Sequence, residues 1–159
     1  MADFKLEDLK ALREQLGTGM VETKNALVEA GGDLEKATEL LRLRGAKSNA
    51  KRSDRSTSEG LIAAKESDAG VTLIELACET DFVAKSAKFI ALGEKVLDAV
   101  AASGASTVEE ALAGAAGDQT VSQLISDEAA ILGEKVELRR VQLVTGENYS
   151  VYLHRTSSD

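Results

Sequence analysis

Asp81 and Phe82 place a carboxylate beside a large aromatic ring in a chain whose residues are only 3% aromatic. They lie at an expected corner, because the apolar run 71–78 predicts a strand and the residues after position 86 repeat apolar side chains at helical spacing. Corners between such elements often carry functional side chains. The residue pattern by itself favours a purely structural role, in which Thr80 or Asp81 caps the helix and Phe82 packs beneath it.

The residue types give little support for covalent chemistry. Cys78 and His154 could act as nucleophile and base, but no third side chain stands out to orient the histidine, which lies close to the end of the chain. No glycine-rich run has the spacing of a nucleotide-binding loop. The sequence therefore predicts a binding protein without catalytic residues, cofactor or metal ligands.

Charge and hydropathy indicate which partners and which cellular location the protein can have. The net charge of −8 opposes general binding to nucleic acids or anionic membranes. Hydrophobic residues make up 43% and charged residues 29% of the chain, which is typical of globular proteins. No apolar run reaches the roughly 18 residues that span a bilayer, and the first residues lack the features of a signal peptide. A cytoplasmic location is expected.

Cations are concentrated between residues 42 and 55, where six stand against one acid. They are Arg42, Arg44, Lys47, Lys51, Arg52 and Arg55. Such a run is most often a solvated helix face or linker, and less often a contact for phosphate or an acidic partner. Because residues 46–58 are also rich in serine, we expect them to form a basic linker between two domains.

Residues 1–45 predict a domain of three short helices. The first helix carries leucines at helical spacing, has acids in its first turn and ends at Gly17. The second runs over about residues 20–30, and the third is capped by Asp33 and closed by Gly45. Three helices of this length bury only a small core, which suits a small docking module.

Residues 59–154 predict an α+β core domain, followed by a loose tail at 155–159. Strand-like runs at 60–64 and 71–78 flank turn residues and would form a hairpin. A long helix, two shorter helices with capping-box spacing and a further strand come next. The run 149–154 would be the last strand, at the edge of a small antiparallel sheet with helices packed against it.

Three motifs, spread over nearly the whole chain, carry a resemblance to a known family. They are Leu12-Arg13 with Gly17-Thr18-Gly19-Met20, Lys24, Ala26-Leu27 and Gly32-Asp33; Cys78-Glu79-Thr80-Asp81-Phe82-Val83-Ala84-Lys85; and Gly133-Glu134-Lys135 with Leu138-Arg139-Arg140. In this order they resemble the bacterial elongation factor Ts family, and the second motif is the most specific. The resemblance implies a three-helix domain like the ubiquitin-associated (UBA) domain, followed by the first half of that family's dimerisation-type α+β core.

The resemblance also implies a function. In that family, one segment presses into the nucleotide domain of elongation factor Tu and disturbs its magnesium site; here the matching residues are Thr80, Asp81, Phe82 and Val83. The chain would be a guanine-nucleotide exchange factor that promotes GDP release and GTP reloading, with Phe82 as an apolar wedge and Asp81 as a polar lever. The helical domain would dock on the same domain of elongation factor Tu, where Leu12 and Met20 are candidate contacts, with a core role also open for each.

A binding module of another kind is the alternative function. The three-helix domain would then grip a ubiquitin-like or ribosomal partner, and the cations Lys47, Lys51 and Arg52 would contact RNA. Such binding would weaken steeply with salt, because it depends on neutralising phosphates.

The family resemblance bears on assembly as well. Many elongation factor Ts proteins continue past the position of His154 with a second, related half. We therefore expect such a half, or a second copy of this chain forming a homodimer through the sheet edge, to complete the sheet.

Overall fold

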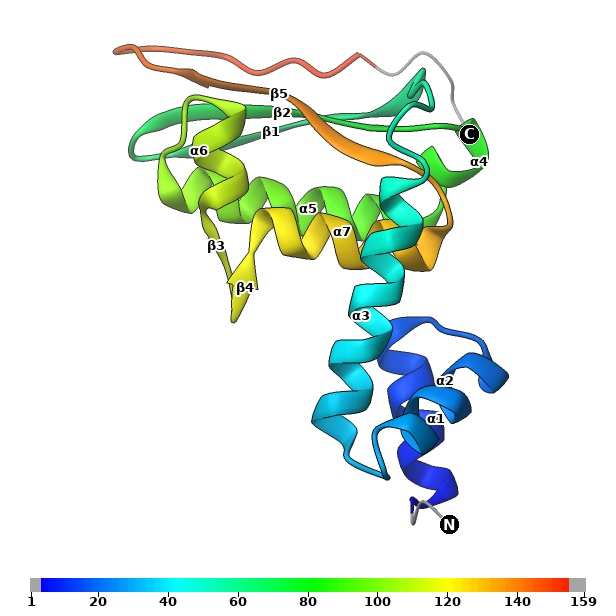
Figure 1. The fold of residues 1–159 in the computed structure, drawn as a ribbon. Coiled ribbons are helices and arrows are strands. Elements are labelled where there is room, and N and C mark those ends of the chain that lie inside the picture. Colours follow the sequence, from blue (N-terminus) through cyan, green and yellow to red (C-terminus); the bar gives the residue numbers. More distant parts are fainter. Residues whose placement is uncertain (1–3, 155–159) are drawn as a thin grey trace. The chain divides into compact units, whose positions relative to one another are not determined.

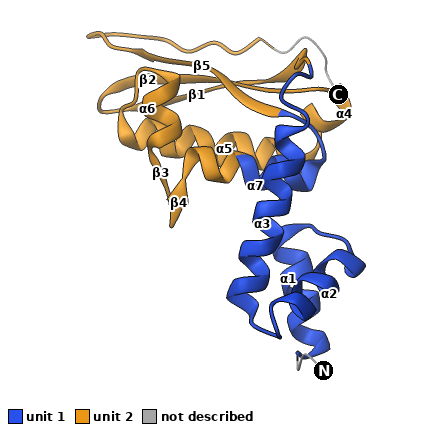
Figure 2. Cartoon of the chain, in the orientation of Figure 1, with its two compact units in different colours: residues 1–55, 126–135 blue, residues 56–125, 136–159 orange. Residues whose placement is uncertain are grey.

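The computed structural model describes residues 4–154, so the predicted tail at 155–159 lies outside the described residues. The chain divides into two compact units, residues 1–55 with 126–135 and residues 56–125 with 136–159 (Figure 2). The first unit is helical, and the second contains a small antiparallel sheet with helices. This α+β architecture confirms the predicted fold class. The likeness of the helical part to a UBA domain and the domain boundaries stay predictions.

The helical unit begins with the three predicted helices. They are α1 (Leu6–Leu16), α2 (Met20–Glu29) and α3 (Leu34–Ala50). α1 ends where predicted, since Gly17 has a φ of 60° and a side chain in this left-handed conformation would be strained. The turn that follows is closed by Thr23, whose hydroxyl donates to the Gly19 carbonyl at 2.9 Å.

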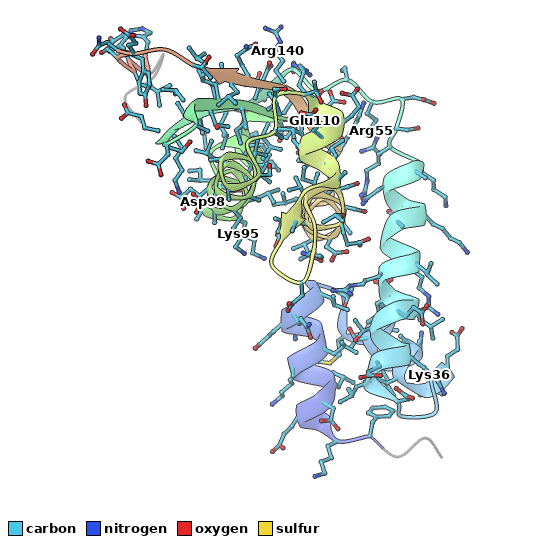
Figure 3. All side chains as sticks on the ribbon, turned by 90° about the vertical axis from the view of Figure 1, so that its left-hand side faces the viewer. Lys36, Arg55, Lys95, Asp98, Glu110 and Arg140 are labelled. Atoms are coloured by element: carbon cyan, nitrogen blue, oxygen red, sulfur yellow. The ribbon has the colours of Figure 1, made fainter. Side chains whose placement is uncertain are left out.

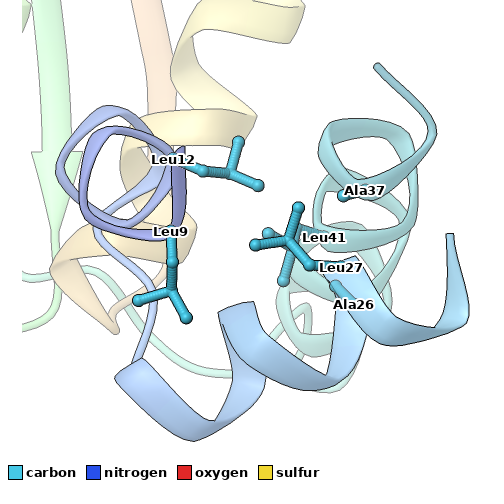
Figure 4. Packing of buried hydrophobic residues seen from close by; sticks show 6 residues of the cluster. All are labelled: Leu9, Leu12, Ala26, Leu27, Ala37 and Leu41. Carbon is cyan, nitrogen blue, oxygen red and sulfur yellow. The ribbon is translucent and has the colours of Figure 1, made fainter. Parts of the chain in front are cut away.

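The core of these three helices consists of six buried apolar side chains (Figure 4). They are Leu9 and Leu12 of α1, Ala26 and Leu27 of α2, and Ala37 and Leu41 of α3. The two alanines allow the helix backbones to approach closely while the leucines fill the space between them. Leu12 therefore takes the core role that the sequence left open for it.

α3 does not end at Gly45, contrary to the prediction, but continues to Ala50. A glycine in a helix interior costs about 1 kcal/mol relative to alanine. Here the bare backbone packs against α7 (Val121–Leu132), because a Cβ at Gly45 would lie only 3.0 Å from the Cβ of Ala130. Farther along α3, Asn49 donates to the Ser126 carbonyl at 2.8 Å. This packing outweighs the glycine, so the first part of the expected linker is helical.

Asp33 caps α3 as predicted, and its side chain accepts hydrogen bonds from the N–H groups of Lys36 (3.1 Å) and Glu35 (3.0 Å). The bond from Lys36 is the main cause that lowers the pKa of Asp33 below its ordinary value. A carboxyl with a lowered folded-state pKa stabilises the fold above its unfolded pKa, and this contribution disappears as pH falls through the folded value.

We therefore expect Asp33→Ala to lower the melting temperature of the helical unit near neutral pH. The difference from the unsubstituted chain should shrink on acidification below about pH 4. Melting curves followed by circular dichroism at several pH values would check this. Asp33→Asn is the matched control, since it retains a capping oxygen without the titratable charge. A difference that grows on acidification would contradict the assignment.

The sheet of the second unit has the order β1-β2-β5. β1 (Glu59–Ser67) and β2 (Gly70–Cys78) form the predicted antiparallel hairpin, and β5 (Val136–Val144) pairs antiparallel with the other edge of β2. β2 is therefore the central strand, and most of its residues are buried on both faces, as its apolar sequence predicted.

The long predicted helix is α5 (Ala87–Ser103), which runs along one face of the sheet (Figure 1). Its inner side is buried, and Phe89 is completely covered. Gly93 lets α5 approach β1 closely, because a Cβ there would lie 2.8 Å from Cδ2 of Leu61. α6 (Val108–Ala113) begins at the predicted capping box of Thr107 and Glu110. The sequence missed the short hairpin of β3 (Ala115–Ala116) and β4 (Gln119–Thr120) that follows.

Residues 149–154 form no strand, so the last predicted strand is wrong. Their alternating sequence fits a strand, but a strand also needs a neighbour that accepts and donates its backbone hydrogen bonds. Apolar side chains in this segment remain exposed, among them Tyr152 and Leu153. The expected homodimer was to form through an edge strand at residues 149–154. The structure has no strand there for a second copy to pair with.

Candidate partner-binding site

The corner after β2 folds into a single helical turn that the sequence did not predict, α4 (Asp81–Ala84). Before it, the buried Cys78 thiol donates to the Thr80 carbonyl at 3.3 Å. The Thr80 hydroxyl caps the turn by accepting from the Val83 N–H at 3.4 Å. After it, Ser86 donates to the Val83 carbonyl at 2.7 Å and caps α5. Side-chain hydrogen bonds therefore hold both ends of α4.

Phe82 is the most exposed large apolar side chain of the described residues, with 84% of its surface open to solvent. Thr80 does cap a helix, as the structural interpretation of the corner expected, but Phe82 does not pack beneath it. Single exposed apolar residues are common on protein surfaces, so exposure alone does not define a site. The ring nevertheless stands on a short turn whose two ends are held by side-chain hydrogen bonds.

Asp81 and Lys85 form an ion pair across α4, with 3.4 Å between Oδ2 and Nζ. More than half of each side chain is exposed, so water screens the pair and its contribution to stability is small. The carboxylate therefore can exchange Lys85 for another cation at little cost. The sequence offered a signal for this pair, because oppositely charged residues four apart on a helix face each other.

Met20, at the start of α2, is 44% exposed and directly follows the turn at residues 17–19. Val21, next to it, is also exposed. Leu12 lies in the core and is 4% exposed, so it offers a partner little surface. Of the two candidate docking residues on the helical unit, the structure leaves Met20 accessible.

The basic run is partly neutralised within the helical unit. Arg44 pairs with Glu29 at 2.6 Å, and Arg42 pairs with Asp127 of α7 at 3.5 Å. Arg52 donates to the side chain of Asn49 at 3.2 Å. These ion pairs involve Arg42 and Arg44, whereas the RNA alternative names Lys47, Lys51 and Arg52, so that alternative stays a prediction.

The remaining reactive side chains do not form a catalytic arrangement. The thiol of Cys78 is buried and bonded to the Thr80 carbonyl, whereas the exposed ring of His154 lies 3.2 Å from the Tyr152 hydroxyl. Within residues 4–154, no cluster of three carboxylate, imidazole or thiol side chains could hold a metal ion. None of the helices in this part of the chain has the length and apolar character needed to cross a bilayer.

The chain is similar in sequence to known proteins, and the similarity includes the corner. The family model described as elongation factor TS matches residues 79–158, which begin at the corner. The chain is 70% identical over 160 residues to elongation factor Ts of Leifsonia xyli subsp. xyli, and 68% identical over 159 residues to that of Clavibacter sepedonicus. Elongation factor Ts of Tropheryma whipplei is 52% identical. Each match covers the whole of this chain but only 58% of the relative.

Proposed function

The chain belongs to the elongation factor Ts family, and from this membership we propose that it binds elongation factor Tu and promotes the release of GDP. It performs no covalent chemistry, and GTP then reloads the emptied site. The observation that carries the proposal is the exposure of Phe82 on α4, because a wedge must be accessible before it can enter a partner.

Phe82 provides the apolar part of the contact. Burying an exposed phenylalanine side chain contributes about 1.5–3 kcal/mol, so insertion of the ring into a pocket of elongation factor Tu can drive a local displacement there. Because the Thr80 hydroxyl accepts from the Val83 N–H and the Ser86 hydroxyl donates to the Val83 carbonyl, both ends of α4 are fixed and the turn loses little conformational freedom on binding. The gain from burial is then available to move groups on the partner.

Asp81 provides the polar part. The magnesium ion in such a nucleotide site bridges phosphate oxygens and protein ligands and neutralises their charge. A carboxylate brought close to this site competes for its cationic and hydrogen-bonding groups, and its own charge repels the phosphates. Asp81 can do so once its exposed ion pair with Lys85 opens. Weaker magnesium binding loosens GDP.

The helical unit provides a second point of attachment through Met20. Two linked contacts raise the effective concentration of each other, so docking by the helical unit would keep α4 close to the nucleotide domain. Release of the factor follows from reciprocity: if its binding weakens nucleotide binding, nucleotide binding must weaken the factor's binding by the same ratio. Incoming GTP thus displaces the chain.

Release of fluorescent GDP from elongation factor Tu tests the proposal. If the chain weakens GDP binding by speeding dissociation, release should accelerate on the order of 10- to 100-fold, which lies within the change in affinity usual for coupled sites. The acceleration should saturate with chain concentration, because it passes through a complex. An unchanged release rate at saturating chain would refute the proposed function, and a pull-down would then show whether the two proteins bind at all.

A further inference from the structure

Arg139 lies at an irregularity of β5 that changes the direction of its side chain. Glu75 of β2 is paired with Arg140 and Leu76 is paired with Leu138, so Arg139 is an extra residue without a partner opposite it in β2. Neighbouring residues of a regular strand point to opposite faces, but a bulge redirects one of them. As a result both arginines reach the same carboxylate: Arg139 lies 3.2 Å and Arg140 3.1 Å from oxygens of Glu75.

The two arginines otherwise differ. Arg139 is about one-third exposed and also contacts Glu137, at 3.2 Å, together with both the carbonyl and the hydroxyl of Thr57. The Thr57 hydroxyl in turn donates to Glu137. Arg140 is 79% exposed, and Figure 3 shows it on the side of the sheet away from α5. Of the two arginines, Arg139 is therefore the one that contacts the segment leading into β1, where Glu137 of β5 also accepts a hydrogen bond from Thr57.

The pKa of Arg139 is raised above its ordinary value, mainly by the hydrogen bond to Glu137 and further by Glu75. An arginine guanidinium is charged over the ordinary pH range in any case. Its planar fork matches several acceptors at once, which the ammonium group of a lysine cannot reproduce. Thr57, Glu75, Glu137 and Arg139 together form a clamp that joins the segment before β1 to β2 and β5.

This clamp lies at the end of the sheet that carries the corner. Thr57, which is only 7% exposed, precedes the first residue of β1, Glu59, by two positions. Glu59 is paired with Cys78, the last residue of β2, and Cys78 is also paired with Val136, the first residue of β5. α4 begins three residues after Cys78 and contacts both β1 and β2. α4 therefore packs partly on β1, and the clamp holds the segment at the start of that strand.

We infer that Arg139 is a positioning residue for the corner: by fixing Thr57 against β5 it holds the start of β1 in place, and this keeps α4 rigid enough to act on a partner. The expected effect on GDP release rests on the proposed exchange function. The expected effect of Arg139 on the order of α4 does not, because it is a property of the free chain. It gives a role to the Leu138-Arg139-Arg140 motif, which the exchange mechanism itself does not use.

Hydrogen exchange of the free protein tests the link directly, with Arg139→Met compared to Arg140→Met. Both changes remove a cation from Glu75, but only the first removes the arginine's contacts to Thr57. The hydrogen bond from Thr57 to Glu137 is left in place by both changes. We expect amide exchange in residues 57–60 and 79–86 to become about tenfold faster in Arg139→Met and to stay within about twofold in Arg140→Met. Unchanged exchange at 79–86 in Arg139→Met, or equal acceleration in both variants, would overturn the inference.

The kinetics of GDP release supply a second measurement, because loss of positioning should change the maximal rate without changing the half-saturating concentration. Looser positioning of α4 should lower the maximal release rate about fivefold, while the half-saturating concentration stays within about twofold because Met20 still docks. Arg139→Lys should recover only part of the rate. If Arg139→Met does not fold, Thr57→Val against Thr57→Ser makes the same comparison, with a smaller effect expected because the carbonyl contact remains.

The two proposals fail in different ways. If the unsubstituted chain does not accelerate GDP release, the proposed function is wrong, and the hydrogen-exchange comparison still decides whether Arg139 positions the corner. If the unsubstituted chain accelerates release and Arg139→Met releases GDP at the same maximal rate, the exchange function stands and the positioning role of Arg139 is refuted.

Discussion

Phe82→Ala is expected to lower the efficiency of GDP release from elongation factor Tu by about 30-fold, which corresponds to the loss of roughly 2 kcal/mol at an interface hot spot. The same change should leave the melting temperature of the free chain almost unaltered, because 84% of the Phe82 surface already faces solvent. A large loss of activity without a loss of stability is the signature of a residue that works on a partner.

The matched control is Tyr152→Ala, since Tyr152 is an aromatic residue of the same unit with 83% of its surface exposed. This change should leave GDP release within about twofold of the unsubstituted chain. Both variants are measured by stopped-flow fluorescence over a range of chain concentrations. Equal activity of Phe82→Ala and the unsubstituted chain would remove the wedge from the mechanism, whatever the contribution of Asp81.

Phe89→Ala should have the largest effect on stability. The ring is fully buried where α5 packs on the sheet, and truncating such a residue typically costs about 3–5 kcal/mol through lost burial and the cavity left behind. For a unit of this size, that loss lowers the melting temperature by roughly 15–30 °C. Because α5 follows α4 directly, the corner should lose its order together with the sheet.

Ile90→Ala is the control for this change, because Ile90 is the next residue of the same helix and is 45% exposed. Its cost should be about 1 kcal/mol or less. Thermal or chemical unfolding followed by circular dichroism measures both variants. A similar loss for the two would mean that α5 is not packed on the sheet through Phe89.

Local signals in the sequence predicted most helix boundaries. Gly17 and the Thr107–Glu110 capping box act through neighbouring backbone groups, so their effect depends little on the rest of the fold. The hairpin of β1 and β2 was equally readable from its turn residues. These features were correct because the interactions that cause them span only a few residues.

Features that depend on distant contacts escaped prediction. The sequence predicted that the third helix ends at Gly45, but α3 continues past it because it packs against Ala130 and Ser126. The alternation in residues 149–154 predicted a strand that has no pairing partner. Arg139, at the bulge of β5, contacts Thr57, which lies 82 positions earlier in the chain. No local sequence pattern predicts a contact between residues so far apart.

The candidate site was predicted only in part. Composition and periodicity placed a corner at residues 80–85 and favoured a buried Phe82, because burial of an aromatic is the easier outcome. The family motif favoured exposure, and the structure has Phe82 exposed on α4. Leu12 shows the opposite case: a motif residue that lies in the core.

The dependence of GDP release on magnesium tests the central claim most directly. Release of fluorescent GDP from elongation factor Tu is measured with and without the unsubstituted chain, once in millimolar magnesium and once in EDTA. If the corner acts by disturbing the magnesium site, the chain should accelerate release strongly in magnesium and only slightly in EDTA, where the ion is already absent. The same fold-acceleration under both conditions would contradict the account.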